Sequence, residues 1–270
     1  VRYYVDPMTY AFGTYVEHGE TRARTDLDWI KSDQTNRRTK KVERLYKRSY
    51  VKLAERLGGC VERAVEAGEG IAPGQLQRAL IRRLCESVIA YQLGRVRDEF
   101  AADPEYAAEE ESIPTPAAVF APYFYVNPSG AAEGLELLFD CANAAGTQGG
   151  STPVHAVLCT DVSMLRDPEF LTQAATGLRE SGVAGVWLWF SGFYEDEAST
   201  ADLVAFRRFV EELREHVEVY NMHGGYFSLA LSRLGLDGVS HGIGYGEQKD
   251  VIPVIGQSTP TVRYYLPDVK

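Results

Sequence analysis

The sequence lacks three patterns that would decide its class at once: a membrane-length apolar run, a CxxC pair and a GxGxxG fingerprint. A membrane-spanning helix needs about 20 consecutive apolar residues, so we expect no membrane partner. Val1 opens no signal-peptide pattern, and we therefore expect a cytoplasmic protein. The cysteines are isolated, which argues against a metal knuckle and favours a reducing compartment. They are Cys60, Cys85, Cys141 and Cys159.

Basic residues are outnumbered by acidic ones. The 270 residues include 28 Lys and Arg against 38 Asp and Glu, a net charge of −10. This excess of negative charge disfavours nucleic acid covering the whole surface. Hydrophobic residues make up 45% and charged residues 24%, an ordinary balance for a globular chain with a real core. We expect a single domain over residues 1–270.

The positive charge is concentrated in one stretch. Between Lys31 and Arg56 there are ten Lys and Arg and three acidic residues, a local net charge of +7, which leaves 18 basic and 35 acidic residues elsewhere. The stretch belongs to a helical segment, residues 27–112, that we expect to be inserted after the first strand. It either binds nucleic-acid phosphates or is a solvated face that docks an acidic protein. The candidate nucleic-acid contacts are Arg37, Arg38, Lys40, Lys41, Arg44, Lys47 and Arg48.

Strand and helix patterns alternate over residues 117–247. Apolar strands are predicted at 117–126, 155–160, 183–190, 217–222 and 238–243, and helices at 131–145, 169–180, from 200 onward and at 226–234. Asp167 and Pro168 are typical of the first residues of a helix. Trp187 and Trp189 alternate along their strand and should share a face. Unbroken apolar strands separated by amphipathic helices indicate a parallel sheet.

Repeated βα units occur in α/β barrels and in doubly wound sheets. The dinucleotide-binding form of the doubly wound sheet would need the missing glycine fingerprint. We therefore predict an α/β fold of the (β/α)8-barrel type, regular or incomplete. A short first strand is predicted at Val1–Val5, and segments 251–255 and 261–266 are candidates to close the barrel. No stretch between Asp6 and Ala117 has the pattern of a second strand.

In a parallel barrel the active site lies at the carboxyl ends of the strands, where the βα loops converge. Polar residues follow six predicted strands of this chain. The catalytic candidates among them are His223, His241, Asp161, Asp6 and Glu247. The candidate ligand-binding residues are Gly224, Gly225, Gly244, Asn221, Asn127, Tyr125 and Ser191. Alternatively, Asp6 and Asp161 only cap the turns that follow them.

His223 and His241 follow neighbouring predicted strands. Histidine titrates near neutral pH, so either residue suits acid–base chemistry; the alternative is a hydrogen-bonded histidine with no chemical role. HxH, HExxH and CxxC spacings are missing, so we predict no metal site and leave the cofactor open. The pair Gly224–Gly225 precedes a predicted helix, where backbone N–H groups suit a phosphate. Otherwise these glycines only allow a close turn.

The segment from Val183 to Glu247 resembles the barrels of the tRNA-guanine transglycosylases. The likeness rests on a strand ending Phe190-Ser191-Gly192-Phe193-Tyr194-Glu195, a strand ending His223-Gly224-Gly225, and the run Leu234-Gly235-Leu236-Asp237-Gly238-Val239 after the next helix. The resemblance implies a barrel, and members of that family exchange a base through an aspartate on the strand after this helix. Ser240 stands at the corresponding position, and no cysteine cluster matches the family's zinc ligands. We therefore transfer no catalytic role.

Two function hypotheses follow. The first is a barrel-type enzyme, a transferase or hydrolase, that binds a phosphorylated or nucleotide-like ligand at the strand ends. The second is a non-catalytic barrel, a scaffold or recognition subunit that docks nucleic acid or an acidic protein through the basic helical segment. An enzyme that holds a nucleic-acid strand with this segment and modifies it at the strand ends would combine the two.

Overall fold

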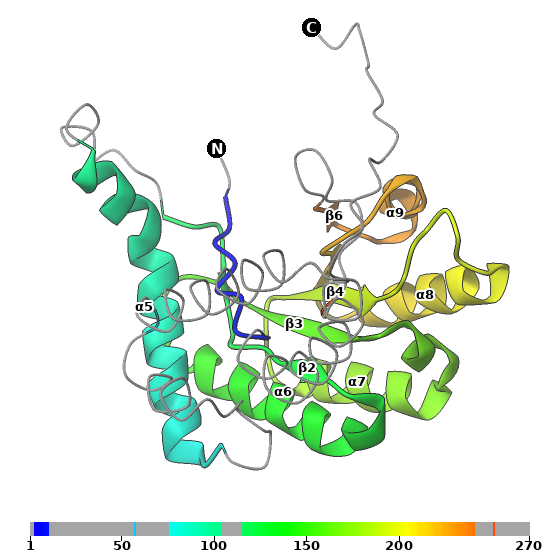
Figure 1. The fold of residues 1–270 in the computed structure, drawn as a ribbon, viewed down its shortest axis with the longest axis horizontal. Coiled ribbons are helices and arrows are strands. Elements are labelled where there is room, and N and C mark those ends of the chain that lie inside the picture. Colours follow the sequence, from blue (N-terminus) through cyan, green and yellow to red (C-terminus); the bar gives the residue numbers. More distant parts are fainter. Residues whose placement is uncertain (1–2, 11–56, 58–75, 104–114, 241–250, 252–270) are drawn as a thin grey trace, which may run out of the picture.

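The computed structural model describes residues 3–10, 57, 76–103, 115–240 and 251. Within them the chain forms a six-stranded sheet in which every pairing is parallel (Figure 1). The strands are β1 (Val119–Phe120), β2 (Tyr125–Val126), β3 (Val154–Asp161), β4 (Gly185–Ser191), β5 (Glu218–Asn221) and β6 (Gly238–Val239). Their order is β1-β3-β4-β5-β6, and β2 also pairs with β3. Since β4 occupies one edge of β3, both β1 and β2 lie along its other edge.

Helices follow the strands in alternation. They are α6 (Ala131–Gly146), α7 (Pro168–Glu180), α8 (Thr200–Leu213) and the short α9 (Tyr226–Leu231), with 3₁₀ turns η3 (Pro128–Gly130), η4 (Val162–Arg166) and η5 (Ser232–Leu234). The Asp167 side chain accepts hydrogen bonds from two backbone N–H groups at the start of α7, and Pro168 is the first residue of that helix. The predicted α/β alternation and this helix start are both confirmed.

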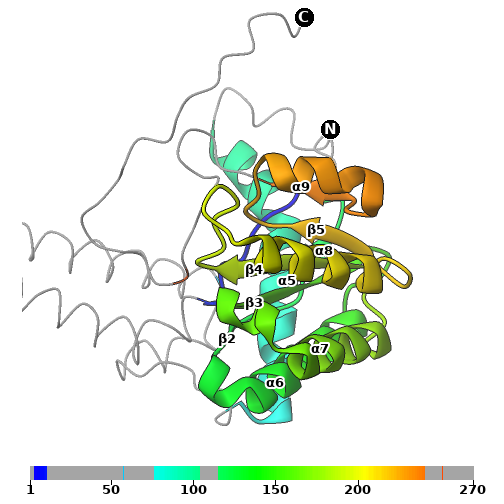
Figure 2. The same cartoon turned by 90° about the vertical axis from the view of Figure 1, so that its right-hand side faces the viewer.

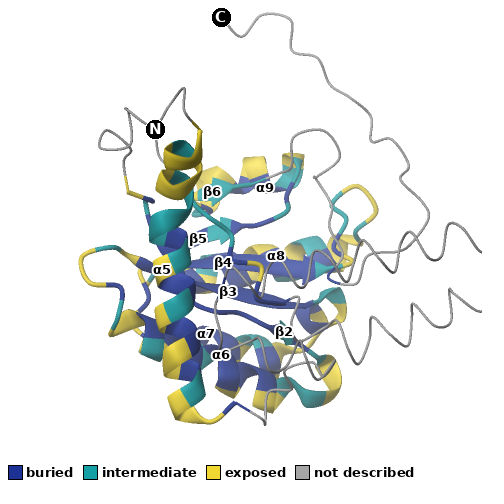
Figure 3. Ribbon diagram, turned by 60° about the vertical axis from the view of Figure 1, so that its left-hand side comes forward, coloured by how far each residue is buried: buried dark blue, intermediate teal, exposed yellow. Residues whose placement is uncertain are grey.

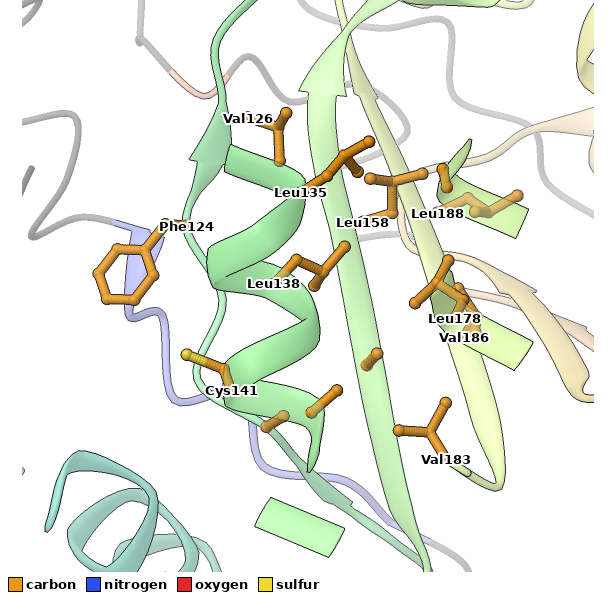
Figure 4. Packing of buried hydrophobic residues seen from close by; sticks show 14 of the residues in the cluster. Phe124, Val126, Leu135, Leu138, Cys141, Leu158, Leu178, Val183, Val186 and Leu188 are labelled. Atoms are coloured by element: carbon orange, nitrogen blue, oxygen red, sulfur yellow. The ribbon is translucent and has the colours of Figure 1, made fainter. Parts of the chain in front are cut away.

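The helices α6, α7 and α8 cover one face of the sheet, here called the helix face (Figure 2). In the close-up, Leu135 and Leu138 of α6 lie beside Leu158 of β3, and Leu178 of α7 lies beside Val186 of β4 (Figure 4). Burying such side chains stabilises the fold by roughly 25 cal/mol for each Å² of apolar surface removed from water. This apolar layer holds the helices against the sheet.

The opposite face, here called the aromatic face, is built from large rings. Trp187 and Trp189 both lie on it, which confirms that they share a face. Residues 3–10 (dark blue in Figure 1) pack against it, with the Tyr10 ring centroid 4.8 Å from that of Trp189 and the planes at 83°. The buried members of this face are Tyr10, Phe120, Tyr123, Val157, Cys159, Trp187, Trp189, Met222 and Val251.

The long helix α5 (Arg78–Ala102) packs against α6 and β1, with its buried stripe turned inward (Figure 3). Gln92 on this helix is fully buried. Its Oε1 accepts a hydrogen bond from the Phe120 N–H at 2.7 Å, and its Nε2 donates to the Phe120 carbonyl at 2.8 Å. One side-chain amide thus takes the place of a neighbouring strand and satisfies the outer edge of β1. Among the described helices, none has the length and apolarity of a membrane span.

Several predictions about the barrel need correction. The described strands form an open sheet, so a closed (β/α)8 barrel is not shown. The expected strand 117–126 is divided into β1 and β2. The N–H groups of Val119 and Ala121 donate to β3, but the next N–H on that side, from Tyr123, donates to Thr9 Oγ1 at 2.7 Å instead. Within the expected first strand, Tyr3–Val5 has no strand structure and contributes the Tyr3 carbonyl to one backbone hydrogen bond, from Ala117.

Other predicted elements lie outside the described residues. Most of the helical segment 27–112 lies outside the described residues, apart from residue 57 and residues 76–103. The candidate closing strands also lie outside them, except residue 251. The helical insertion and the single-domain boundaries therefore stay predictions.

Candidate functional site

Asp161 and Ser191 end β3 and β4 and are register partners. Parallel neighbours lie about 4.8 Å apart, so these two residues stand side by side at the carboxyl edge of the sheet. Side chains alternate along a strand, and Cys159 and Trp189 lie on the aromatic face. Asp161 and Ser191 therefore belong to that face too. The structure brings together two of the candidate residues, and both are half-buried.

Both residues also have partners within the chain. Asp161 Oδ1 accepts a hydrogen bond from the Ser163 N–H at 2.9 Å and caps η4, as one of the two interpretations expects. A carboxylate has about four acceptor positions, so one capping bond leaves capacity for a ligand. Ser191 Oγ accepts from the Val251 N–H at 3.1 Å, which leaves its own O–H able to donate.

His223 lies two residues beyond the end of β5. Its imidazole approaches Trp189 edge-on, with ring centroids 4.9 Å apart and an interplanar angle of 69°. Its backbone N–H donates to Oδ1 of the buried Asn221 at 3.4 Å. Trp189 is two residues before Ser191 on the same face, so the His223 ring lies on the aromatic face near the end of β4. Three candidates from three successive βα units thus gather at one edge.

The expected phosphate position at Gly224 and Gly225 is taken by a carboxylate of the chain itself. Glu195, in the loop after β4, accepts hydrogen bonds from two backbone N–H groups at the start of α9, at 2.9 and 3.2 Å. A Cβ on Gly225 would lie 3.0 Å from Glu195 Oε2, and one on Gly224 would lie 2.7 Å from Asn221 Nδ2 and from Ser228 Oγ. Both glycines leave room for these close contacts, which agrees with the alternative that they only allow a close turn.

Glu195 and Ser228 are the members of this site that were not among the candidates. The Ser228 hydroxyl donates to Glu195 Oε1, and Ser228 Oγ accepts from Asn221 Nδ2 at 2.7 Å. One signal in the sequence could have found them. Gly225 precedes the helix α9 and has no side chain to satisfy its first N–H groups, so an acceptor from elsewhere is required. The acidic run Glu195-Asp196-Glu197, which follows β4, contains one.

The remaining described candidates have structural partners. Asp6 Oδ1 accepts from the Tyr123 hydroxyl at 2.7 Å and so ties the N-terminal segment to the aromatic face. Burial, and then the charge of Asp6, raises the pKa of Tyr123 well above its ordinary value, so the phenol stays a donor. Asn127 follows β2, and its Oδ1 caps η3. Tyr125 is half-buried and is the register partner of Cys159.

His241, Gly244 and Glu247 lie outside the described residues, as do the seven basic candidates between Arg37 and Arg48, so their roles stay predictions. The residues that flank 241–250 are described, and both lie at the carboxyl edge. The Ser240 N–H donates to the Asn221 carbonyl at 2.9 Å, and Val251 donates to Ser191 as described above.

A second histidine lies at the amino end of the sheet. Trp187 Nε1–H donates to His155 Nδ1 at 3.0 Å, and His155 Nε2 lies 4.0 Å from Glu218 Oε2. That carboxylate accepts from the Tyr220 hydroxyl at 2.7 Å, and the Tyr220 ring stacks on Trp187. Burial lowers the pKa of His155, while Glu218 opposes this effect. His155 is 2% exposed. Together with Tyr4, this cluster therefore packs the strands at the amino end of the sheet and is not an accessible site.

Among the described residues, no three His, Cys, Asp or Glu side chains lie close enough to share a metal ion. A hollow of about 250 Å³ opens between the ends of α7 and α8, beside Arg179, Glu212 and His216. It lies away from the carboxyl edge. The chain matches no protein-family model, no curated protein and no solved structure. Inference about function therefore rests on the geometry of the carboxyl edge.

Proposed function

We propose that the carboxyl edge of β2–β5 is the ligand site of an enzyme that acts on a phosphorylated or nucleotide-like compound. One observation carries the proposal: Asp161, Ser191 and His223 reach the same edge and face from three successive βα units. In parallel α/β folds, ligands bind outside the carboxyl ends of the strands, where the connecting loops meet. The sheet supplies a rigid base for side chains of different chemistry.

Each of the three groups has a distinct role in this proposal. His223 transfers the proton in a group-transfer or hydrolysis step, because one nitrogen of a neutral imidazole donates and the other accepts, and this side chain is only half-buried. Asp161 accepts a hydrogen bond from a ligand hydroxyl beside its capping bond to η4. The Ser191 hydroxyl donates to a ligand oxygen, since its own oxygen already accepts from Val251.

A nucleotide-like ligand suits the mixture of rings and polar groups at this edge. Bases stack on aromatic side chains, which contributes about 1–3 kcal/mol for each base. Tyr125 and His223 are half-buried rings from β2 and the β5–α9 turn. Asn127 follows β2 with an amide that suits the polar edge of a base. Gly224 and Gly225 are left to the turn, because Glu195 takes the nearby N–H groups.

The test is binding of defined probes to the full chain. A nucleoside, a 5′-nucleoside monophosphate and inorganic phosphate are titrated separately by calorimetry, and we expect the monophosphate to bind best. Asp161→Asn and His223→Gln should each weaken that binding by about tenfold, or about 1.4 kcal/mol. Asparagine keeps the capping oxygen, so η4 is preserved.

Asp167→Asn is the matched control, because it makes the same change at the N-cap of α7, outside the proposed contacts. Its affinity for the monophosphate should equal that of the wild type. The proposal is wrong if the wild type binds none of the three probes. It is equally wrong if Asp161→Asn and His223→Gln bind the monophosphate as tightly as Asp167→Asn does.

The charge of +7 between Lys31 and Arg56 favours a second proposal, a nucleic-acid contact through the basic segment. Phosphate contacts release counterions, so affinity for a single-stranded oligonucleotide should fall steeply as salt is raised. Replacing Lys40 and Lys47 with glutamate should lower both the affinity and this salt dependence. Fluorescence anisotropy measures both. Absent or salt-independent binding would leave an acidic protein as the partner of this segment.

A further inference from the structure

We infer that Glu195 is a positioning residue for His223 and acts through Ser228 and Asn221. The three residues form a continuous chain of hydrogen bonds. The Ser228 hydroxyl donates to Glu195 Oε1, Asn221 Nδ2 donates to Ser228 Oγ at 2.7 Å, and the His223 N–H donates to Asn221 Oδ1 at 3.4 Å. The effect on ligand binding rests on the proposed function, whereas the effect on His223 does not.

The negative charge of the Glu195 carboxylate sets which group donates and which accepts in each of these hydrogen bonds. An ionised carboxylate only accepts, so the Ser228 hydroxyl proton must point at Glu195. The Ser228 oxygen is then an acceptor, and it selects the NH₂ side of the Asn221 amide. The amide oxygen is consequently turned to the His223 N–H. Without the carboxylate, the Ser228 hydroxyl can rotate, and the Asn221 amide loses its reason to keep this orientation.

Burial keeps the side chains in this series of hydrogen bonds from bonding to water instead. Asn221 is 3% exposed and Ser228 is fully buried, so neither can exchange its partner for water without cost. The missing side chain of Gly224 leaves the space in which Asn221 meets Ser228. Glu195 also accepts from backbone N–H groups of Phe227 and Ser228. It therefore links the loop after β4 to the whole turn that carries His223.

The position of His223 has a spectroscopic signature. Its ring lies edge-on to Trp189 with the centroids 4.9 Å apart, so the indole ring current displaces the imidazole proton resonances. These resonances report the placement of His223 whether or not a ligand is present. A residue with a purely structural role elsewhere in the fold would change stability without moving them.

The experiment compares Glu195→Ala and Glu195→Gln with Glu197→Ala, in which the exposed neighbour two residues on is removed. NMR follows the imidazole protons of His223, assigned by their loss in His223→Gln. We expect Glu195→Ala to lose the displacement caused by Trp189 and to bind the nucleoside monophosphate about tenfold more weakly. Glu195→Gln keeps one acceptor oxygen and should retain part of both. Glu197→Ala should match the wild type.

The inference is overturned if folded Glu195→Ala keeps the wild-type His223 resonances. If Glu195→Ala does not fold, the same decision falls to Glu195→Gln, which preserves size and hydrogen bonding: unchanged resonances would overturn the inference, and shifted ones would support it. A wild type that binds no probe would contradict the proposed function alone, because the His223 resonances still decide the role of Glu195.

Discussion

The two ends of the sheet contain similar side chains but treat them differently. At the amino end, His155 is enclosed by Trp187, Tyr220 and Tyr4, and Trp187 donates directly to its ring nitrogen. At the carboxyl end, His223 is half-buried, its backbone N–H donates to Asn221, and its ring makes a T-shaped contact with Trp189. One histidine is part of the packing, while the other is presented at an edge.

This difference suggests that side chains at the amino end stabilise the fold, whereas side chains at the carboxyl end are available to bind a ligand. Polar groups that pair with each other inside a cluster of rings hold neighbouring strands together and have little left for a ligand. At the carboxyl end, Asp161 is fixed by one capping bond and keeps acceptor positions for a ligand. We therefore expect substitutions at the amino end to change the free energy of unfolding and leave probe binding unaltered. Substitutions of Asp161 or His223 should do the reverse.

The largest expected effect is that of Trp187→Ala. Removing this ring leaves a cavity beside His155 and Tyr220 and should lower the free energy of unfolding by about 3–5 kcal/mol, measured by urea denaturation. Trp187→Phe keeps most of the ring but loses the donor to His155, so it should cost about 1 kcal/mol. Tyr226→Ala, at a ring 63% exposed on α9, is the control and should stay within about 0.5 kcal/mol of the wild type. If Trp187→Ala and Tyr226→Ala lowered the free energy of unfolding equally, the amino-end cluster would have no special role in stability.

Gln92→Leu should come next. The Phe120 N–H and carbonyl, at the level of His155, would both lose their partner inside the protein. Leaving buried backbone groups unpaired costs at least about 1 kcal/mol each, so we expect a total loss of at least about 2 kcal/mol in urea denaturation. Gln173→Leu, on the exposed side of α7, makes the same change without a buried partner and should cost nearly nothing. A small loss for Gln92→Leu would mean that water or another group satisfies the edge of β1.

Asp202→Asn tests whether the carboxyl end has stabilising contacts that are separate from the site. Asp202 joins α8 to η4 through two bonds from Arg166, at 2.7 and 2.8 Å. The Arg166 guanidinium, assisted by Ser199, holds the pKa of Asp202 at about 2. We expect Asp202→Asn to lower the free energy of unfolding by about 2 kcal/mol at neutral pH and to leave affinity for the monophosphate unchanged.

The pH dependence of this effect has a definite sign. The pKa of Asp202 is lower in the folded state than in the unfolded chain, so the ionised carboxylate stabilises the fold fully above about pH 4. That contribution is lost as the pH falls toward about 2. The difference between the wild type and Asp202→Asn should therefore shrink over this range in chemical denaturation. A constant difference would contradict the assigned role of the charge.

The smallest effect is expected from the titration of His155. Burial lowers its pKa, so the unfolded chain binds a proton that the folded chain resists, and stability should fall as the pH drops from about 7 to about 5. His155→Gln keeps an acceptor for Trp187 and should flatten this slope by less than the Asp202 effect. An unchanged slope in His155→Gln would contradict the assigned role of His155.

Local features of the fold were predictable because they depend on neighbours in the sequence. The unbroken apolar runs that became β3 and β4, and the helix start at Asp167 and Pro168, were found within a residue or two. The strand 117–126 is divided because the Tyr123 N–H donates to Thr9, a residue 114 positions away that the local pattern does not indicate. The first strand failed because β-branched and aromatic residues also suit a segment packed flat on a face of rings, as Tyr4 shows.

The candidate site was only partly predictable, because sequence patterns report on neighbouring residues and not on contacts between distant ones. Strand ends at Asp161, Ser191 and Asn221 could be found from the pattern, because a parallel sheet brings carboxyl ends to one edge. Glu195 was not found, since its partner Ser228 is 33 residues away along the chain. The Gly224–Gly225 pair could equally suit a phosphate or a close turn, and only the position of the Glu195 carboxylate distinguishes them.

The order of apolar and polar residues along the chain was sufficient to determine alternating strands and helices, a parallel sheet and the edge at which its polar residues emerge. Contacts between distant segments determined the rest: which histidine is enclosed and which is presented, which amide closes the outer strand, and which carboxylate occupies the start of α9. The physical reason is that periodicity and capping act over a few residues. Desolvation and hydrogen-bond direction depend on every group that packing brings into reach.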